Sequence, residues 1–172
     1  YYLKSGDASA CLVIGSETLS RICDPHDRDS MIYADGAGAT VLEARDNEQP
    51  TGILSHQART DAQQEAYFLR MEPSVAEDHD DTLYMKMDGR KLYQYALSNV
   101  PGVVQSSLQK ADIGFSDVHK VLVHQANAKM DSAIIKRLAK LYDEEAPDDV
   151  MPMTISWLGN TSVATVPTLL DL

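Results

Sequence analysis

The chain has 172 residues, of which 44% are hydrophobic and 24% are charged, a composition typical of a folded domain and not of a disordered chain. Acidic residues outnumber basic ones by 26 to 15, which gives a formal net charge of −11 and argues against nucleic-acid binding, because that needs a basic face. No run approaches the roughly 18 consecutive apolar residues of a membrane span, and the two cysteines give no disulfide framework, so we expect a reducing compartment, the cytoplasm.

The first part of the chain predicts a helix end followed by strands. Residues 1–6 have the pattern of a last helical turn closed by a glycine. Residues 9–16 form a short apolar run bounded by glycines, which predicts a buried strand. Residues 31–34 and 39–44 predict two further strands, joined by a glycine-rich turn over residues 35–38.

The middle of the chain is less regular. The polar residues 46–51 indicate a boundary between two units, and residues 52–59 predict another strand. Residues 61–82 contain an acidic patch and predict a long surface excursion. From Asp88 onward apolar residues recur at helical spacing, and Pro101 should kink or divide that helix.

The last third alternates strands with helices. Residues 118–123 predict a strand that ends at His124, and residues 127–141 predict a helix. Residues 154–158 predict a strand, which is followed by a turn and then a helix from Ser162 onward. Strands that alternate with helices indicate the α/β class.

Two strand ends in this region carry polar residues that could act together. His124 begins the motif HQAN, residues 124–127, and Asn160 lies in GNTS, residues 159–162. Because ligand groups gather beyond the C-terminal ends of strands in open α/β sheets, a strand–helix–strand unit can bring the two side chains together. A histidine and an asparagine can each donate to one carbonyl oxygen, so the pair is a candidate oxyanion hole. Each residue alone also fits a structural role.

The two motifs together resemble the β-ketoacyl-acyl-carrier-protein synthase III family of thiolase-like condensing enzymes. The resemblance keeps its order along nearly the whole chain, with residues 55–85 hard to match, and it includes the segments GSETLSR (15–21), CDPHDR (23–28), DGAGA (35–39) and MDGR (87–90). It implies a thiolase-like αβαβα layered fold, in which residues 1–46 end the N-terminal half and residues 47–172 form most of the C-terminal half. Both chain ends look cut, so we expect an internal fragment that is inactive alone.

The resemblance also implies a reaction: the decarboxylative Claisen condensation of an acyl-CoA primer with malonyl-acyl-carrier protein in fatty acid biosynthesis, by a homodimer that needs no cofactor. His124 and Asn160 match the family's histidine and asparagine, whose N–H groups would hold the enolate oxygen. Arg28 matches an arginine that stacks on the adenine of coenzyme A, with an exposed loop arginine as the alternative. The family's nucleophilic cysteine opens a helix, and it should lie upstream of Tyr1.

Other chemistries fit the residues less well. Cys11 lies inside a predicted apolar strand and Cys23 in a connector, so neither is expected to replace the nucleophile. The glycine pair Gly36 and Gly38 lacks the third glycine of a dinucleotide fingerprint, and it predicts a tight turn or a close backbone approach instead. We expect no metal site, because none of the five histidines has the sequence spacing of metal ligands relative to the two cysteines. The histidines are His26, His56, His79, His119 and His124.

The predicted helix at 127–141 has one basic face, because residues advance about 100° each along a helix. Its basic residues are Lys129, Lys136, Arg137 and Lys140. In an acidic chain this face predicts a dock for a strongly acidic partner, and the resemblance implies that this partner is acyl-carrier protein. A solvated face balanced by the acidic loop 143–149 is the alternative. The opposite side should face the core through Met130, Ile134, Leu138 and Leu141. Asp131 lies among these apolar residues without an explanation.

Two alternative functions stay open. One is a non-catalytic partner subunit that keeps the fold and binds carrier protein. The other is a specialised-metabolite ketosynthase of the same fold, with another primer or extender. The residue at the start of the upstream helix would separate catalysis from the partner role, because catalysis requires a cysteine there.

Overall fold

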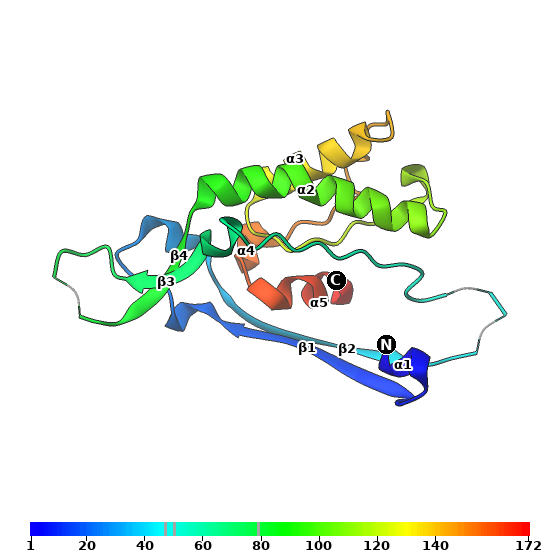
Figure 1. The fold of residues 1–172 in the computed structure, drawn as a ribbon, viewed down its shortest axis with the longest axis horizontal. Coiled ribbons are helices and arrows are strands. Elements are labelled where there is room, and N and C mark those ends of the chain that lie inside the picture. The colour runs from blue at the N-terminus through cyan, green and yellow to red at the C-terminus, as the bar shows by residue number, and fades with distance from the viewer. Residues whose placement is uncertain (47, 50, 79) are drawn as a thin grey trace.

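The computed structural model describes residues 1–46, 48–49, 51–78 and 80–172. Asn47 and Pro50, which fall within the predicted boundary, and His79 lie outside the described residues. Two long helices, α2 and α3, lie on one side of the molecule and the β1–β2 pair lies on the other, with α5 between them (Figure 1). Within the described part, none of the helices is long and apolar enough to cross a membrane.

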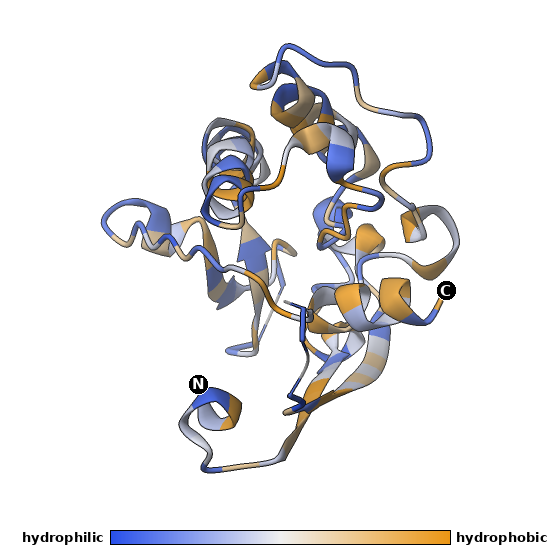
Figure 2. Ribbon diagram, turned by 90° about the vertical axis from the view of Figure 1, so that its right-hand side faces the viewer, coloured by the Kyte–Doolittle hydropathy of each residue, from blue (hydrophilic) through white to orange (hydrophobic). Residues whose placement is uncertain are grey.

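The chain opens with the predicted helix end and strand, but the strand is not buried as predicted, because Leu12, Val13 and Ile14 are each more than half exposed. α1 (Tyr2–Ser5) ends at Gly6, which adopts φ 82° and donates its N–H to the carbonyl of Leu3. β1 (Ala10–Thr18) then pairs antiparallel with β2 (Asp35–Glu43) along its whole length. Figure 2 shows that hydrophobic residues recur along both this pair and α5, the helix that packs on it.

The glycine-rich segment lies inside β2, so the predicted turn at residues 35–38 is wrong. A Cβ added at Gly38 would lie 2.4 Å from Cβ of Pro167, and one at Gly36 would lie 2.9 Å from Cβ of Thr161. Both distances are far below van der Waals contact, so only glycine lets the segment around α5 (Thr165–Asp171) approach the strand this closely. The close backbone approach, which was the other prediction for these glycines, is confirmed.

The middle of the chain departs from prediction in three places. Residues 31–34 do not form a strand, because Arg28–Ile32 is a 3-10 helix. Residues 52–59 form no strand either. The predicted excursion contains β3 (Leu69–Pro73), which pairs antiparallel with β4 (Leu83–Met87).

The two long helices form where the periodicity predicts them. α2 (Gly89–Lys110) begins after Asp88, whose carboxylate accepts a hydrogen bond from the N–H of Lys91 at 3.2 Å. Pro101 lies inside α2 and does not divide it. α3 (Ala128–Lys140) is capped by Asn127 and packs against α2.

The main core lies between α3 and the segments on either side of it. Its buried residues are Phe115, Ile135, Leu138, Ala139, Val150 and Met151. Burial of Ile134 and Leu138 confirms the predicted inner face of α3. Leu141 is 47% exposed and the prediction for it is wrong, because α3 ends at Lys140 and Leu141 follows the last helical turn.

The predicted strands around the two motifs are also absent from the described residues. Residues 118–123 form no strand, although the N–H of Val121 donates to the carbonyl of Val150 at 2.8 Å. Residues 154–158 were predicted as a strand, but Ile155–Leu158 forms the short helix α4. A 3-10 helix, Ser162–Ala164, then leads into α5.

Asp131 is the most unusual residue of the α3 inner face. It is fully buried, and neither carboxylate oxygen has a hydrogen-bond partner among the described residues. Desolvation raises its pKa to about 6, against a weaker opposing effect of the Asn127 backbone. The unfolded chain therefore loses this proton at lower pH than the folded protein does, so folding stability falls as pH rises from about 4 to about 6 and stays low above that range.

We expect Asp131→Leu to stabilise the complete protein by roughly 1–3 kcal/mol at pH 8 and by less at pH 5, because the substitution removes a buried carboxylate without a partner. Thermal midpoints from calorimetry at the two pH values measure the effect. Asp148→Asn, at an exposed position, is the matched control and should change neither midpoint. A lower midpoint for Asp131→Leu at pH 8 would contradict the expectation.

Candidate functional site

His124 lies four residues before the first residue of α3, and its ring is oriented by Ser162, the last residue of GNTS, and by Thr165. Its Nδ1 lies 3.1 Å from the carbonyl oxygen of Ser162 and 3.5 Å from the hydroxyl of Thr165. A carbonyl oxygen can only accept, so Nδ1 carries the proton of this hydrogen bond. The contact thus links the HQAN motif to the GNTS motif.

Protonation decides what the other ring nitrogen of His124 can do. Desolvation lowers the pKa of His124, and the hydrogen bond to Ser162 opposes that effect only in part. The ring is therefore neutral near pH 7, and with the proton on Nδ1 its Nε2 presents a lone pair. Nε2 becomes a donor only when the ring takes up a second proton, which a developing negative charge beside it favours.

Asn160 is buried, and one half of its side-chain amide is fixed. Its Oδ1 accepts the N–H of Ser162 at 2.9 Å, which assigns the amide orientation and leaves Nδ2 as the available donor. Its backbone bridges to the chain around Tyr33: the N–H of Asn160 donates to Ile32 at 2.8 Å, and its carbonyl accepts from Ala34 at 2.9 Å. The donor is therefore held by backbone bonds as well as by its own side chain.

Gly159 makes this placement possible. It adopts φ 70°, in the left-handed region that favours glycine. A Cβ there would lie 2.9 Å from Cβ of Ala34 and 3.2 Å from the carbonyl oxygen of Ile32. The glycine of GNTS thus allows Asn160 to pair with the backbone beside it.

Gln125 has a structural role that the sequence analysis missed. It is fully buried, and its Oε1 accepts the backbone N–H groups of Thr154 at 2.7 Å and Ile155 at 2.8 Å. Its Nε2 donates to the carbonyl of Pro152 at 2.8 Å. Gln125 therefore satisfies two of the free N–H groups at the start of α4, which stabilises a helix start at this point. A long amide beside the candidate histidine is the only signal that pointed to it.

One cavity brings three of the predicted site residues together. It has a volume of about 690 Å³, and its walls include His124, Asn160 and Arg28. Much of the remaining wall is apolar and rich in methionine, with Met31, Met85, Met87, Leu92, Tyr93 and Met130. A hydrophobic hollow with a few convergent polar groups has the character of a small-molecule site. Neither Cys11 nor Cys23 lines it.

The cysteines have the properties of ordinary thiols. Both are free and half-buried. Burial raises the pKa of Cys23, and the nearby Asp35 raises it further, so its thiolate is disfavoured. Among the described residues no cluster of histidine, cysteine and acidic side chains could hold a metal ion.

The basic residues of α3 separate into two kinds. Lys129, Lys136 and Lys140 are exposed, and none forms an ion pair with another described residue. Arg137 is engaged, because its guanidinium donates to the carbonyl of Leu97 on α2 at 2.9 Å. From the acidic loop, Asp149 pairs instead with Lys120, at 3.0 Å.

Two family models match the chain at its two ends. The model described as 3-oxoacyl-[acyl-carrier-protein (ACP)] synthase III matches residues 1–62, and the model of the C-terminal part of the same synthase matches residues 108–172. The chain belongs to the 3-oxoacyl-[acyl-carrier-protein] synthase III family. The first match includes Arg28, and the second includes His124 and Asn160.

Known members of this synthase III family are similar along almost the entire chain. The β-ketoacyl-[acyl-carrier-protein] synthase III of Pectobacterium atrosepticum is 37% identical over 171 residues, which are 99% of this chain and 51% of that protein. The crystal structure of the 3-oxoacyl-(acyl carrier protein) synthase III of Pseudomonas aeruginosa superimposes with a TM-score of 0.82 at 30% identity, over 99% of this chain and 50% of that one. This chain thus spans about half the length of these relatives, and the thiolase-like α/β fold is confirmed.

A third similar protein comes from polyketide biosynthesis. It is the priming β-ketosynthase of a polyketide biosynthetic pathway, whose crystal structure gives a TM-score of 0.79 at 26% identity, over 99% of this chain and 50% of that one.

Proposed function

We propose that this chain is part of a 3-oxoacyl-[acyl-carrier-protein] synthase III that condenses an acyl-CoA primer with malonyl-acyl-carrier protein in fatty acid biosynthesis. The observation that carries the proposal is the single cavity shared by His124, Asn160 and Arg28. Residues 1–46 then complete one half of the thiolase-like fold and residues 47–172 form most of the other. The complete protein works as a homodimer in the cytoplasm, without a cofactor.

In the proposed reaction the acyl group moves from coenzyme A to a cysteine thiolate, which releases coenzyme A as the thiol. That cysteine belongs to residues outside this chain, because neither of its own cysteines lines the cavity. Malonyl thioester then loses carbon dioxide, and the electron pair of the broken C–C bond forms an enolate. The enolate carbon attacks the acyl carbonyl, the C–S bond breaks, and the cysteine leaves as a thiolate.

Two side chains of this segment stabilise the enolate oxygen. Asn160 offers its Nδ2–H, since its Oδ1 is held by Ser162. His124 offers Nε2–H after its ring takes up a proton from water, which the growing negative charge favours, while Nδ1–H stays on the Ser162 carbonyl. Arg28 binds the adenine end of the primer by stacking, at the part of the cavity wall formed by its 3-10 helix.

The direct test is synthesis of product by the complete protein. Incubated with labelled acetyl-CoA and malonyl-acyl-carrier protein, it should release carbon dioxide and form labelled 3-oxobutanoyl-carrier protein in equal amounts. The proposal would be overturned if carbon dioxide were released without labelled product, or if neither carbon dioxide nor labelled product were formed.

Docking of the carrier protein is proposed for the exposed lysines of α3. Lys129, Lys136 and Lys140 form no ion pair with another described residue, which supports the docking role. Lys136 lines a hollow together with Glu144, Glu145 and Asp148, so a face balanced by loop 143–149 stays the alternative. Their helix begins four residues after His124, and Asn127 and Met130 at its start line the cavity, which supports a docking face close to it. Arg137 is tied to α2 and contributes less. An acidic partner would be attracted to such a face.

We expect the double variant Lys129→Glu and Lys136→Glu to raise KM for malonyl-acyl-carrier protein about tenfold, because charges at the rim of an interface mainly steer encounter. Added salt should raise the KM of this double variant little further. Steady-state rates with the carrier-protein substrate, compared with acylation by acetyl-CoA, measure the effect. Lys110→Glu, at the exposed lysine that ends α2, is the control for a charge reversal outside this face. Equal losses with both substrates, or none with either, would refute the docking role.

The priming β-ketosynthase is the observation that favours a second candidate, a specialised-metabolite ketosynthase of the same fold. Such an enzyme uses the same constellation with another primer or extender, so a panel of acyl-CoA primers tested on the complete protein separates the two. A non-catalytic partner subunit would bind carrier protein and form no acyl-cysteine with any primer.

A further inference from the structure

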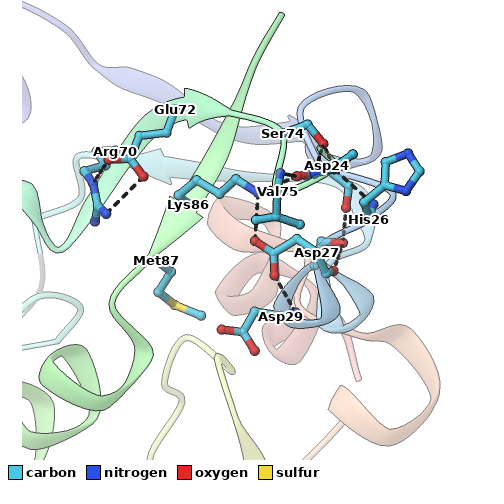
Figure 3. A network of polar contacts seen from close by, with 12 residues as sticks. Asp24, His26, Asp27, Asp29, Arg70, Glu72, Ser74, Val75, Lys86 and Met87 are labelled. Atoms are coloured by element: carbon cyan, nitrogen blue, oxygen red, sulfur yellow. Dashed lines mark hydrogen bonds and ion pairs between the residues drawn. The ribbon is translucent and has the colours of Figure 1, made fainter. Parts of the chain in front are cut away.

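A buried ionic network joins the β3–β4 hairpin to the loop that precedes Arg28 in the sequence (Figure 3). Its centre is Lys86 on β4, only 7% exposed, whose ammonium group binds the carboxylates of Asp24 and Asp27. The distance from its Nζ to Oδ2 of Asp27 is 2.8 Å. A lysine this deeply buried is found in proteins only where it is paired.

Asp24 joins the loop before Arg28 to the β3–β4 hairpin. It is fully buried, and besides Lys86 its carboxylate accepts the backbone N–H of His26 and Val75 and the hydroxyl of Ser74. Desolvation raises the pKa of Asp24, but these hydrogen bonds outweigh it and hold the pKa well below its usual range. The carboxylate therefore stays ionised and fully satisfied, so this end of the network is rigid.

Asp27 connects Lys86 directly to the helix that carries Arg28. One carboxylate oxygen, Oδ1, accepts the backbone N–H of Asp29 at 2.9 Å and caps the 3-10 helix Arg28–Ile32. The other oxygen, Oδ2, accepts from Lys86. Since Arg28 is the first residue of the capped helix, the position of its backbone follows from the position of Asp27.

Strand geometry separates the two roles of β4. Met85 and Met87 line the cavity, whereas Lys86 lies between them in sequence and points to the opposite face. The strand that forms one part of the cavity wall thus also holds, through Lys86, the loop that forms another part. Buried ion pairs contribute little net stability compared with apolar residues of the same size, so stability alone does not explain this one.

We propose that Lys86 is a positioning residue for Arg28, and that its bond to Asp27 sets the affinity of the cavity for thioesters that carry a nucleotide. The inference rests on the proposed function, because it assumes that Arg28 meets the adenine of coenzyme A. It adds that this recognition depends on a lysine that does not touch the ligand.

The test uses Asp27→Asn and Asp27→Ser in the complete protein. Both keep an oxygen that can cap the 3-10 helix, and both remove the negative charge that Lys86 binds. Asp27 is half-buried, with 22% of its side chain exposed, so we expect both variants to fold. Glu72→Gln is the matched control, because it neutralises a carboxylate of the exposed pair with Arg70 on the same hairpin.

Two measurements separate positioning from a general structural effect. Titration calorimetry with coenzyme A should show Kd raised about tenfold in both Asp27 variants and unchanged in the control. The kcat/KM for S-acetyl-N-acetylcysteamine, which has no nucleotide, should stay within about twofold of wild type.

The outcomes also separate this inference from the proposed function. If the wild-type protein does not bind coenzyme A, the proposed primer is wrong. If wild type binds it and both Asp27 variants bind it equally well, the role of Lys86 is overturned. Equal losses with coenzyme A and with the truncated thioester, or a variant that does not fold, would assign Lys86 a structural role instead and would likewise overturn the proposal.

Discussion

His124→Ala and Asn160→Ala should each lower the decarboxylation of malonyl-acyl-carrier protein by the complete protein about 100-fold or more, while transfer of the acyl group to the cysteine largely survives. The reason is that each variant removes one of two donors to the enolate oxygen, and a single such donor is worth about 100- to 1,000-fold in related acyl-transfer chemistry. Acyl loading needs the thiolate and makes no enolate, so it does not depend on this pair.

The two steps can be measured separately. Labelled acetyl-CoA reports loading, and carbon dioxide release reports decarboxylation. Asn160→Asp is the sharper variant, because an aspartate keeps an oxygen for the N–H of Ser162 but has no N–H to offer the enolate. His119→Ala, at an exposed histidine outside the cavity wall, is the matched control. Carbon dioxide release at the wild-type rate in the His124 and Asn160 variants would remove both residues from the proposed site.

Gly15→Ala should destabilise the complete protein by roughly 2–4 kcal/mol, at the upper end of the cost of overpacking. A Cβ at Gly15 would lie 2.3 Å from the carbonyl oxygen of Val163, which is backbone and cannot move without shifting its segment. That segment includes the Ser162 carbonyl that orients His124. We therefore expect Gly15→Ala to lower the thermal midpoint and also the rate of decarboxylation.

Gly102→Ala provides the control for this effect. Gly102 lies inside α2, and a Cβ there would meet no atom within 4 Å. Alanine is a better helix former than glycine, so this variant should increase the free energy of unfolding by up to about 1 kcal/mol and raise the thermal midpoint slightly. A midpoint for Gly15→Ala equal to that of wild type would show that β1 and the segment before α5 have room to separate.

The elements that the sequence predicts well are those whose signal is local. α2 and α3 follow from helical periodicity and from the capping side chains of Asp88 and Asn127. The glycine-rich segment illustrates the limit, because a glycine pair fits a turn and a strand equally well from sequence alone. Pairing with β1 makes the segment a strand, and the close approach of Pro167 to Gly38 explains why glycine is needed there.

The sequence predicts the residues of the candidate site, but it does not predict the residues that hold them in place. Resemblance indicated His124, Asn160 and Arg28, and one cavity contains all three. Gln125 and Lys86 gave no comparable signal, because their roles depend on partners that are distant in sequence. Burial of a polar side chain among such partners is a property of the fold, and local pattern does not contain it.

The backbone bridge between Asn160 and the chain around Tyr33 also has a consequence for the order of folding. It joins two segments that lie near opposite ends of the chain, so closing it carries the entropic cost of a very long loop. Contacts of this kind form slowly compared with the helices α2 and α3, whose bonds are local. The site should therefore be among the last parts of the molecule to assemble, and a ligand that needs both Arg28 and Asn160 would recognise only chains that have finished folding.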